Sequence, residues 1–236
     1  MRKKIQILST KKLNEPLITN AENIGITIVS TDFIEIKSID SSTITEKIKH
    51  YSAETIAVIF TSVNAVEAVF AMLDTKPDWK IFCTSGATKE ALLKYIDEKR
   101  IVDTEHNASA LADKVIAHKG IDSCVFFCGN QRLNTLPDKL LRHKIDLDEV
   151  IVYESIASSK KINENYDGIL FFSPSGVDSF FSVNKIDNKT VLFSIGKTTT
   201  KEIRKCTNNH IVTSFFPSAE SVVAEVKKYF IESVDA

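Results

Sequence analysis

Short apolar runs rich in Ile, Val and Phe recur along the chain, and most are followed by a cluster of Ser, Thr, Asn or Gly and then by a segment with helical spacing. Continuous apolar runs of this length are typical of strands that are covered by helices on both faces. The alternation therefore predicts parallel α/β layers. The expected strands span residues 4–8, 25–29, 55–60, 80–82, 124–128, 168–172, 190–195 and 210–215.

Two helical segments carry a clear apolar stripe, which indicates a face packed on a core rather than a ligand site. The first stripe lies within residues 63–73 and the second within residues 222–230, near the end of the chain. The stripes consist of Val63, Val66, Val69, Phe70 and Leu73, and of Val222, Val223, Val226, Tyr229 and Phe230.

Two further segments, residues 32–37 and 148–154, are extended and partly alternating, and both lead into polar stretches. If the chain leaves one domain through the first and returns through the second, one domain is inserted into the other. One continuous sheet is the alternative that this pattern leaves open. The expected boundaries are 1–32 with 156–236 for the first α/β domain, 37–149 for the inserted α/β domain, and 33–36 with 150–155 for the connector strands.

The 236 residues and their composition indicate a globular protein of one large or two small domains. With 43% hydrophobic and 26% charged residues and a net charge of −1, the chain has no whole-protein field that would attract nucleic acid or an anionic membrane. No apolar run approaches the roughly 18 residues of a membrane span, and the apolar stretch after the basic start is too short for a signal-peptide core. We therefore expect a cytoplasmic protein that binds neither nucleic acid nor membrane.

Cysteines and histidines do not form recognisable metal or redox motifs. The four cysteines show no CxxC spacing, so we expect reduced thiols in the core. The five histidines lie far apart without HxH or HExxH spacing, so we expect no metal site. These residues are Cys83, Cys124, Cys128 and Cys206, and His50, His106, His118, His143 and His210.

Five turns share one chemistry, because each places hydroxyl, amide or glycine residues between an apolar run and a helical segment. In open parallel sheets the carboxyl ends of the strands face the ligand crevice, and each following helix offers unpaired N–H groups and a partial positive charge. The five turns are therefore candidates for binding an anion. Ser, Thr, Asn and Gly are also ordinary helix caps, so each single turn has a purely structural explanation as well. The turns span residues 60–64, 83–88, 128–131, 172–176 and 195–199.

Motifs of the common nucleotide enzymes and hydrolases are missing from the sequence. There is no GxxxxGK[ST] phosphate loop, no GxGxxG fingerprint and no GxSxG elbow. Tyr153 ends a run of apolar residues in the second connector segment and is followed by Glu154 and Ser155. A phenol there is suited to act as a weak acid toward a leaving group, although a tyrosine that simply packs at a domain boundary fits the pattern equally well.

Taken in order, these segments resemble the uroporphyrinogen-III synthase family over nearly the whole chain. The resemblance implies two α/β domains joined by a two-stranded connector, with the active site in the cleft between them. It implies closure of the linear tetrapyrrole hydroxymethylbilane with inversion of the last pyrrole ring and loss of water, without a cofactor. The segments are residues 60–68, 86–88, 127–137, 150–153, 171–177 and 195–199.

By this resemblance Tyr153 matches the tyrosine that assists departure of the substrate hydroxyl, which leaves an azafulvene that the substituted end of the last ring attacks through a spiro intermediate. The substrate carries many carboxylates, which several helix N-termini and hydroxyls would share. The positions that match polar cleft residues of the family are Thr61, Ser62, Thr88, Ser173, Ser175, Gly176, Thr198 and Thr199. The other turn residues that we assign to substrate binding are Ser85, Gly86, Gly129, Asn130, Gly196 and Lys197.

Two departures from the family pattern are visible. After the first strand the family often has a Thr-Arg-Pro turn, whereas this chain has Ser9-Thr10-Lys11-Lys12, and Ser85 stands where many members have glycine. The alternative function is a non-catalytic two-domain module that binds an anionic small molecule. We expect a monomer, and the sequence leaves open a transient contact with hydroxymethylbilane synthase, the preceding enzyme.

Overall fold

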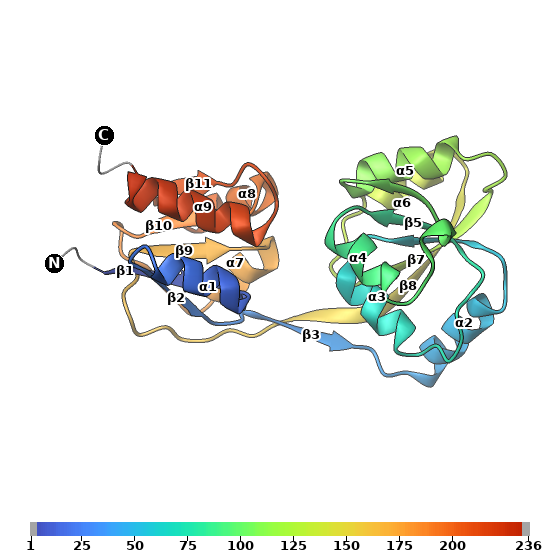
Figure 1. Ribbon diagram of the computed structural model, residues 1–236, viewed down its shortest axis with the longest axis horizontal. Coiled ribbons are helices and arrows are strands. Elements are labelled where there is room, and N and C mark those ends of the chain that lie inside the picture. The colour runs from blue at the N-terminus through green and yellow to red at the C-terminus, as the bar shows by residue number, and fades with distance from the viewer. Residues whose placement is uncertain (1–3, 233–236) are drawn as a thin grey trace. The chain divides into compact units, whose positions relative to one another are not determined.

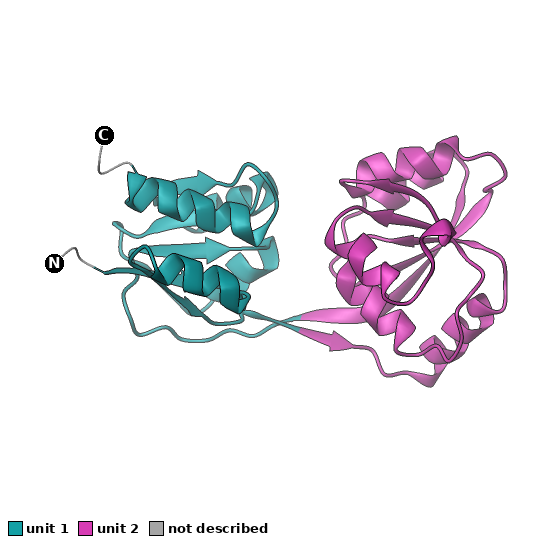
Figure 2. Cartoon of the chain, viewed as in Figure 1, with its two compact units in different colours: residues 1–35, 156–236 teal, residues 36–155 magenta. Residues whose placement is uncertain are grey.

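The computed structural model describes residues 4–232, and its chain forms two compact units. Unit 1 comprises Met1–Glu35 and Ile156–Ala236, and unit 2 comprises Ile36–Ser155 (Figure 2). Each unit has its own sheet, so the alternative of one continuous sheet is wrong. The chain enters unit 2 within strand β3 (Ile34–Ser38) and leaves it within strand β8 (Asp146–Ala157), and these two strands are neighbours in one sheet.

Unit 1 contains a sheet of five strands in the order β11-β10-β9-β1-β2, in which all neighbours are parallel (Figure 1). Because β1 lies between β2 and β9, the sheet combines the start of the chain with its last third. The strands are β1 (Ile5–Ser9), β2 (Ile26–Ser30), β9 (Gly168–Phe171), β10 (Val191–Ser194) and β11 (Ile211–Thr213). The helices are α1 (Glu15–Glu22), α7 (Pro174–Phe181), α8 (Lys197–Cys206) and α9 (Ala219–Phe230).

Helices cover both faces of this sheet, as the continuous apolar strands predict. Successive residues of β1 point to opposite faces. Ile7 packs in a cluster that includes Val222 of α9, whereas Leu8 packs in a second cluster that includes Val177 of α7 and Ile203 of α8. All of these side chains are fully buried, so each face contributes its own hydrophobic core.

Unit 2 contains a sheet of six strands in the order β3-β8-β7-β4-β5-β6, with parallel pairing from β8 to β6. Its strands besides β3 and β8 are β4 (Ala57–Phe60), β5 (Lys80–Thr84), β6 (Ile101–Glu105) and β7 (Ser123–Gly129). Its helices are α2 (Ser42–Ser52), α3 (Val63–Phe70), α4 (Ala87–Leu93), α5 (Ala108–Ala117) and α6 (Thr135–Arg142), with a 3₁₀ turn at Glu98–Arg100.

The core of unit 2 also has two layers. Phe60 stacks on Phe127 with ring centroids 5.3 Å apart and belongs to a cluster with Trp79. The preceding residue, Ile59, points to the other face and packs with a cluster that includes Leu111 of α5. Both faces are thus closed by helices, which leaves the loops at the ends of the strands as the place for function.

Three sequence predictions differ from the structure in detail. Strand β6 was not expected, because its residues Ile101–Glu105 alternate with polar side chains at the sheet edge. The strand expected over residues 210–215 ends at Thr213, because the chain turns at Ser214, whose hydroxyl donates to the carbonyl of Phe216 at 2.7 Å. All four cysteines are free, but Cys206 is exposed and therefore is not a core thiol.

Within residues 4–232 every helix falls short of the length and apolarity needed to cross a membrane. The same residues contain no group of three His, Cys, Asp or Glu side chains placed to hold a metal ion.

Candidate functional site

The carboxyl edge of the unit 2 sheet gathers the turns that the sequence singled out. The parallel register pairs Gly129 at the end of β7 with Tyr153 in β8, and pairs Phe60 at the end of β4 with Phe127 of β7 and Cys83 of β5. The residues at or near the carboxyl ends of these strands therefore lie along one edge of the sheet. These are Thr61, Ser62, Ser85, Gly86, Gly129, Asn130 and Tyr153, each from unit 2.

Tyr153 is held at this edge by contacts on three sides. Its phenol O–H donates to Oγ of Ser62 at 3.1 Å, and its backbone carbonyl accepts from the N–H of Asn130 at 3.2 Å. The ring is half-buried and packs against the hydrophobic cluster around Phe60. The ring is thus fixed on its apolar face, and its oxygen lies beside a second hydroxyl.

Gly129 provides the space that the phenol occupies. A Cβ atom at this position would lie 2.8 Å from the phenol oxygen of Tyr153 and closer still to two of its ring carbons. Any other residue would therefore displace the ring. The register between β7 and β8 shifts between Cys128 and Gly129, and this irregularity sets which residue faces Tyr153.

Ser62 has two roles in this arrangement. It is the N-cap of α3, where its Oγ accepts from the N–H of Asn64 at 3.2 Å. The same oxygen accepts from Tyr153, so the hydroxyl hydrogen of Ser62 remains able to donate to a third group. The structural role of a cap and a role in chemistry are therefore compatible at this residue.

Asn130 and its neighbour tie the turn after β7 to the end of β8. Oδ1 of Asn130 accepts from the N–H of Ser155 at 2.9 Å, and Nε2 of Gln131 donates to the carbonyl of Ser155 at 3.1 Å. These bonds continue the pairing of the two strands past the bulge. The side-chain oxygen of Asn130 is thus used within the protein, while the residue itself is exposed on the edge.

The turn after β5 positions three predicted residues differently. Gly86 directly precedes α4 with a φ of 74°, a backbone conformation that is strained for residues with a side chain and so favours glycine. Thr88 is buried, and its hydroxyl accepts from Oγ1 of Thr84 at 2.9 Å. Oγ of Ser85 lies 2.9 Å from Nδ1 of His106, on the residue that follows β6. Ser85 therefore faces the solvent edge while Thr88 faces the interior.

His106 was not among the predicted site residues. The sequence analysis considered histidines only as metal ligands, and it did not identify the strand that brings His106 to this edge. The signal was nevertheless present, because His106 directly follows the segment Ile101–Glu105, in which alternation of apolar and polar residues indicates an edge strand.

The carboxyl edge of the unit 1 sheet carries the other predicted turns. Ser173 is the N-cap of α7, where its Oγ accepts from the N–H of Gly176 at 3.0 Å and lies 3.1 Å from Oγ of Ser175. Gly176 is buried, and a Cβ atom there would lie 3.2 Å from Oγ of Ser173. This turn therefore presents two hydroxyls and the start of a helix at the edge.

The turn after β10 presents a cation and a hydroxyl. Lys197 and Thr198 are exposed in the first turn of α8, whereas Thr199 is buried. Beneath them, Oγ1 of Thr200 lies 2.5 Å from Oγ of Ser194 and 2.7 Å from Oγ1 of Thr213. These hydroxyls fix the start of α8, which follows Gly196, against the ends of β10 and β11.

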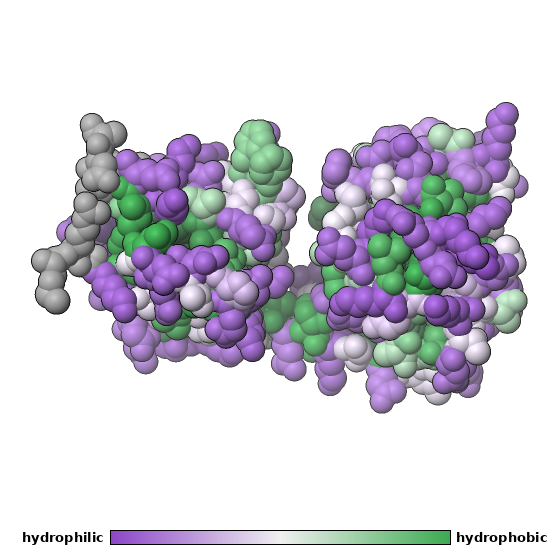
Figure 3. Space-filling view, in the orientation of Figure 1, coloured by the Kyte–Doolittle hydropathy of each residue, from purple (hydrophilic) through white to green (hydrophobic). Residues whose placement is uncertain are grey.

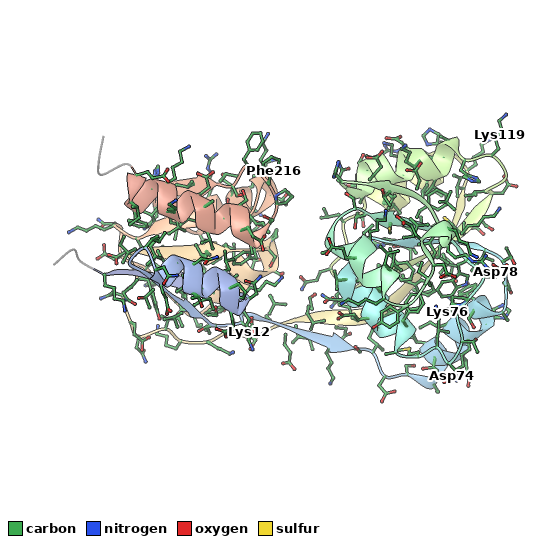
Figure 4. The ribbon with its side chains drawn as sticks, in the orientation of Figure 1. Lys12, Asp74, Lys76, Asp78, Lys119 and Phe216 are labelled. Carbon is green, nitrogen blue, oxygen red and sulfur yellow. The ribbon has the colours of Figure 1, made fainter. Side chains whose placement is uncertain are left out.

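The turn after β1 adds two more cations to the same edge, since β1 lies between β9 and β2. Thr10 is buried, and its hydroxyl donates to the carbonyl of Leu170 at 2.8 Å. Lys11 and Lys12, which follow it, are exposed, and Figure 4 labels Lys12. The sequence analysis noted these lysines only as a departure from the family pattern, but the sheet order places them beside the turn that contains Ser173.

The strongest pKa shift of a tyrosine occurs away from these edges. Burial, followed by a hydrogen bond to Asp148, raises the pKa of Tyr51 to about 12. Burial opposes ionisation of Asp148, but hydrogen bonds from Lys47 and Tyr51 outweigh it and lower the pKa of that carboxyl. Because Asp148 lies at the start of β8, this cluster fixes α2 to the sheet rather than serving the carboxyl edge.

The sequence and fold were compared with known proteins. The family model described as uroporphyrinogen-III synthase HemD matches residues 15–224. The uroporphyrinogen-III synthetase of Helicobacter pylori is 17% identical with a TM-score of 0.66, covering 95% of this chain and 99% of that chain. A mutant uroporphyrinogen III synthase of Thermus thermophilus is 10% identical with a TM-score of 0.65, covering 97% of this chain and 99% of that chain.

No curated protein matches the sequence significantly. At these identities the two solved structures show a shared fold, whereas the family model rests on the sequence itself and spans most of it. The chain therefore belongs to the uroporphyrinogen-III synthase family.

Proposed function

We propose that this protein is a cofactor-independent uroporphyrinogen-III synthase that closes hydroxymethylbilane with inversion of the last pyrrole ring and loss of water. The observation that carries the proposal is the family match over residues 15–224, which makes the chain a cyclising enzyme of the lyase type. The contacts of Tyr153 support it, because they hold a phenol beside a second hydroxyl at the carboxyl edge of a parallel sheet.

In the proposed first step the phenol of Tyr153 donates its proton to the substrate hydroxyl as the carbon–oxygen bond breaks. The bonding electron pair leaves with the oxygen, which departs as water, and the pyrrole nitrogen stabilises the positive carbon as an azafulvene. Ser62 supports this step. Its hydroxyl accepts a hydrogen bond from the phenol before the proton moves, and it can rotate to donate a hydrogen bond to the phenolate afterwards. Ring closure later releases a proton from the pyrrole carbon of the last ring that has formed the closing bond, and that proton restores the phenol.

The remaining task is to hold a substrate with many carboxylates in the geometry for inverted closure. The start of α7, the start of α8 and the exposed ammonium groups of Lys11, Lys12 and Lys197 provide donors and positive charge along the edge of unit 1. A helix N-terminus contributes about 0.3–1 kcal/mol toward a nearby anion, so several weak sites together replace one strong site. We assign Ser173, Ser175 and Thr198 to this role.

The proposal also covers the domain boundaries, the cellular location and the oligomeric state of the protein. Residues 1–32 with 156–236 and residues 37–149 are the two domains, and residues 33–36 with 150–155 are their connector. The unit boundaries at Glu35/Ile36 and Ser155/Ile156 support this division. The protein works as a cytoplasmic monomer, and a transient contact with hydroxymethylbilane synthase would shorten the lifetime of its unstable substrate in solution.

The test supplies freshly generated hydroxymethylbilane to the purified protein after treatment with a chelator, and separates the oxidised products into type I and type III isomers. We expect type III to predominate, whereas a binding module would leave only type I at the spontaneous rate. Tyr153→Phe should lower the type III rate about 100-fold or more, the range that general acid catalysis provides. Tyr229→Phe is the matched control, because that phenol lies on α9 and packs against Phe193.

A further inference from the structure

Two large apolar side chains of unit 1 face solvent side by side. Phe215 is 83% exposed and Phe216 is 63% exposed. Their ring centroids lie 4.8 Å apart with an angle of 82° between the planes, an edge-to-face arrangement. Figure 3 shows the apolar patch on the surface of unit 1, and Figure 4 marks the position of Phe216. We call these two residues the phenyl pair.

The loop that carries the phenyl pair is held in one conformation by hydrogen bonds on both sides. The hydroxyl of Ser214 donates to the carbonyl of Phe216 at 2.7 Å, and the N–H of Phe216 donates to Oγ of Ser221 at 3.3 Å. Ser218 caps α9, and its N–H donates to the carbonyl of Phe216 at 2.9 Å. The two rings are thus held in their exposed position by a hydrogen-bonded loop and do not belong to a frayed segment.

The loop lies next to the turn that we assign to carboxylate binding. It begins at the carboxyl end of β11, where the N–H of Ser214 donates to the carbonyl of Ser194 at the end of β10. The hydroxyl of Thr200 contacts both Ser194 and Thr213, which fixes the first turn of α8 against the end of β11. The phenyl pair therefore shares an edge with the exposed Lys197 and Thr198.

The size of the patch favours a small molecule over a protein. A phenylalanine side chain offers about 150–250 Å² of surface, so two of them offer far less than the roughly 800 Å² per partner of a stable protein interface. The neighbouring lysine and helix N-terminus favour a ligand that carries carboxylates as well as flat apolar rings. A linear tetrapyrrole combines these two features.

We propose that the phenyl pair packs against a pyrrole ring of the substrate and positions it while the neighbouring turns hold its carboxylates. This inference rests on the proposed function. Carboxylates on flexible side arms fix the ends of a substrate but leave its rings free to rotate. An edge-to-face contact with an aromatic ring restricts that rotation, because such contacts prefer defined geometries.

The first test compares the kinetics of the parent protein and three variants on hydroxymethylbilane. In the double variant Phe215→Ala/Phe216→Ala we expect KM to rise about tenfold, the change that the loss of ring contacts of this kind produces, while kcat stays within about threefold. The variant Phe215→Tyr/Phe216→Tyr should restore KM, since tyrosine keeps the rings. Ile24→Ala is the matched control, because Ile24 is an exposed apolar residue at the opposite edge of the same sheet, just before β2.

The second test measures binding by calorimetry without turnover. Uroporphyrin I, which has pyrrole rings and carboxylates, should bind the double alanine variant about tenfold more weakly than the parent, whereas butanetetracarboxylate, which has no ring, should bind both equally. Equal weakening of both ligands, or no weakening of uroporphyrin I, would overturn the proposal. So would a change of oligomeric state in the double variant, which would show that the pair covers a second copy.

The two tests separate this inference from the proposed function. A parent protein that forms only type I product removes the enzymatic function, yet a selective loss of uroporphyrin I binding in the double variant would still support the phenyl pair as a ring-binding element. Type III formation with unchanged KM and unchanged uroporphyrin I binding would leave the enzyme intact and overturn the phenyl pair.

Discussion

The two units are built on the same plan but differ in what their carboxyl edges carry. In each, parallel strands are covered by helices on both faces, and a serine side chain, Ser62 or Ser173, caps the helix α3 or α7. At the edge of unit 2 the cap contacts the phenol of Tyr153, whereas at the edge of unit 1 the neighbouring groups include exposed lysines and the phenyl pair. The same turn chemistry thus lies beside a phenol in one unit and on an edge with exposed cations and aromatic rings in the other.

The interiors differ as well. Unit 2 contains three buried thiols, Cys83, Cys124 and Cys128, and burial raises their pKa values to about 11, 12 and 11. In unit 1 the thiol of Cys206 is exposed. Buried thiols of this kind are poor nucleophiles, because the thiolate is the reactive form. The difference predicts that the two units respond differently to alkaline pH and to thiol reagents.

The largest effect should come from Gly129→Ala, which tests whether the edge of unit 2 depends on the placement of one ring. The new methyl group must push the ring of Tyr153 aside, so we expect the rate of type III formation to fall about as far as in Tyr153→Phe. The free energy of unfolding should fall by about 1–3 kcal/mol. A crystal structure of the variant and its rate constants test this, and a variant with normal activity would show that the ring position is unimportant.

The next effect concerns stability at alkaline pH. In the unfolded chain thiols ionise near pH 8.5, whereas the buried thiols of unit 2 remain protonated to about pH 11 or 12. Between these two pH limits the thiol is ionised in the unfolded chain but still protonated in the folded protein, so rising pH favours unfolding. The stability that is fully present below the unfolded pKa is therefore lost by about 1.4 kcal/mol per pH unit for each such thiol. Tyr51, whose pKa is raised to about 12, adds a loss of the same sign above about pH 10.

Trp79 makes the stability of unit 2 measurable by fluorescence, because it is the single tryptophan of the chain and lies buried in that unit. Urea unfolding followed by its fluorescence should give a stability that falls from about pH 8 to about pH 10. Cys124→Ala should make the fall less steep by about one thiol's contribution. Cys206→Ala is the control and should leave the slope of unit 2 unchanged, since Cys206 lies in unit 1. Equal slopes in all three proteins would contradict the assignment.

A smaller effect distinguishes the two serine caps. Ser62→Ala and Ser173→Ala should each lower the free energy of unfolding by about 1 kcal/mol, because each hydroxyl caps a helix. Their kinetics should differ, since Ser62 contacts Tyr153 and its loss should lower kcat, whereas loss of Ser173 should raise KM. Ser41→Ala is the control, because Ser41 precedes α2 without a side-chain capping bond and its loss should change stability little. Identical kinetic changes in both variants would remove the distinction.

The smallest expected effect concerns how many of the four thiols react with a thiol reagent while the protein is folded. Ellman's reagent should modify one thiol quickly, that of Cys206, and should modify all four only after unfolding. Cys206→Ser should abolish the fast phase without changing the fold. A fast phase that survives in this variant would show that unit 2 opens more easily than its packing indicates.

Most strands could be predicted from the sequence because their residues are apolar on both faces. This pattern can be recognised without knowing which strands pair with each other. It missed β6 because an edge strand such as Ile101–Glu105 needs only one apolar face. The turns were also predictable, but the orientation of their side chains was not. Thr88 and Thr199 stand in the first turns of helices like Thr198, yet both are buried, because the direction of a side chain depends on how the helix docks on the sheet.

The contact between Gly129 and Tyr153 was beyond sequence analysis for a different reason. Each residue was identified separately, but whether the two residues face each other depends on the register of β7 against β8 and on the shift in that register after Cys128. The same holds for Ser85 and His106, which come together only through the pairing of β5 with β6. Properties of single strands were therefore predictable, and properties of strand pairs were not.

The position of β1 inside the unit 1 sheet, between β9 and β2, has a consequence for how the protein is made. A ribosome delivers the chain from its N-terminus, so β1 emerges early, but its neighbour β9 emerges only after all of unit 2, as the pairing of Ile7 with Gly168 shows. Unit 2 is continuous in sequence and can fold as soon as residues 36–155 have left the exit tunnel. During that time β1 can pair with β2 but lacks β9 on its other side, and this unpaired edge makes the nascent N-terminal segment a natural client for chaperones.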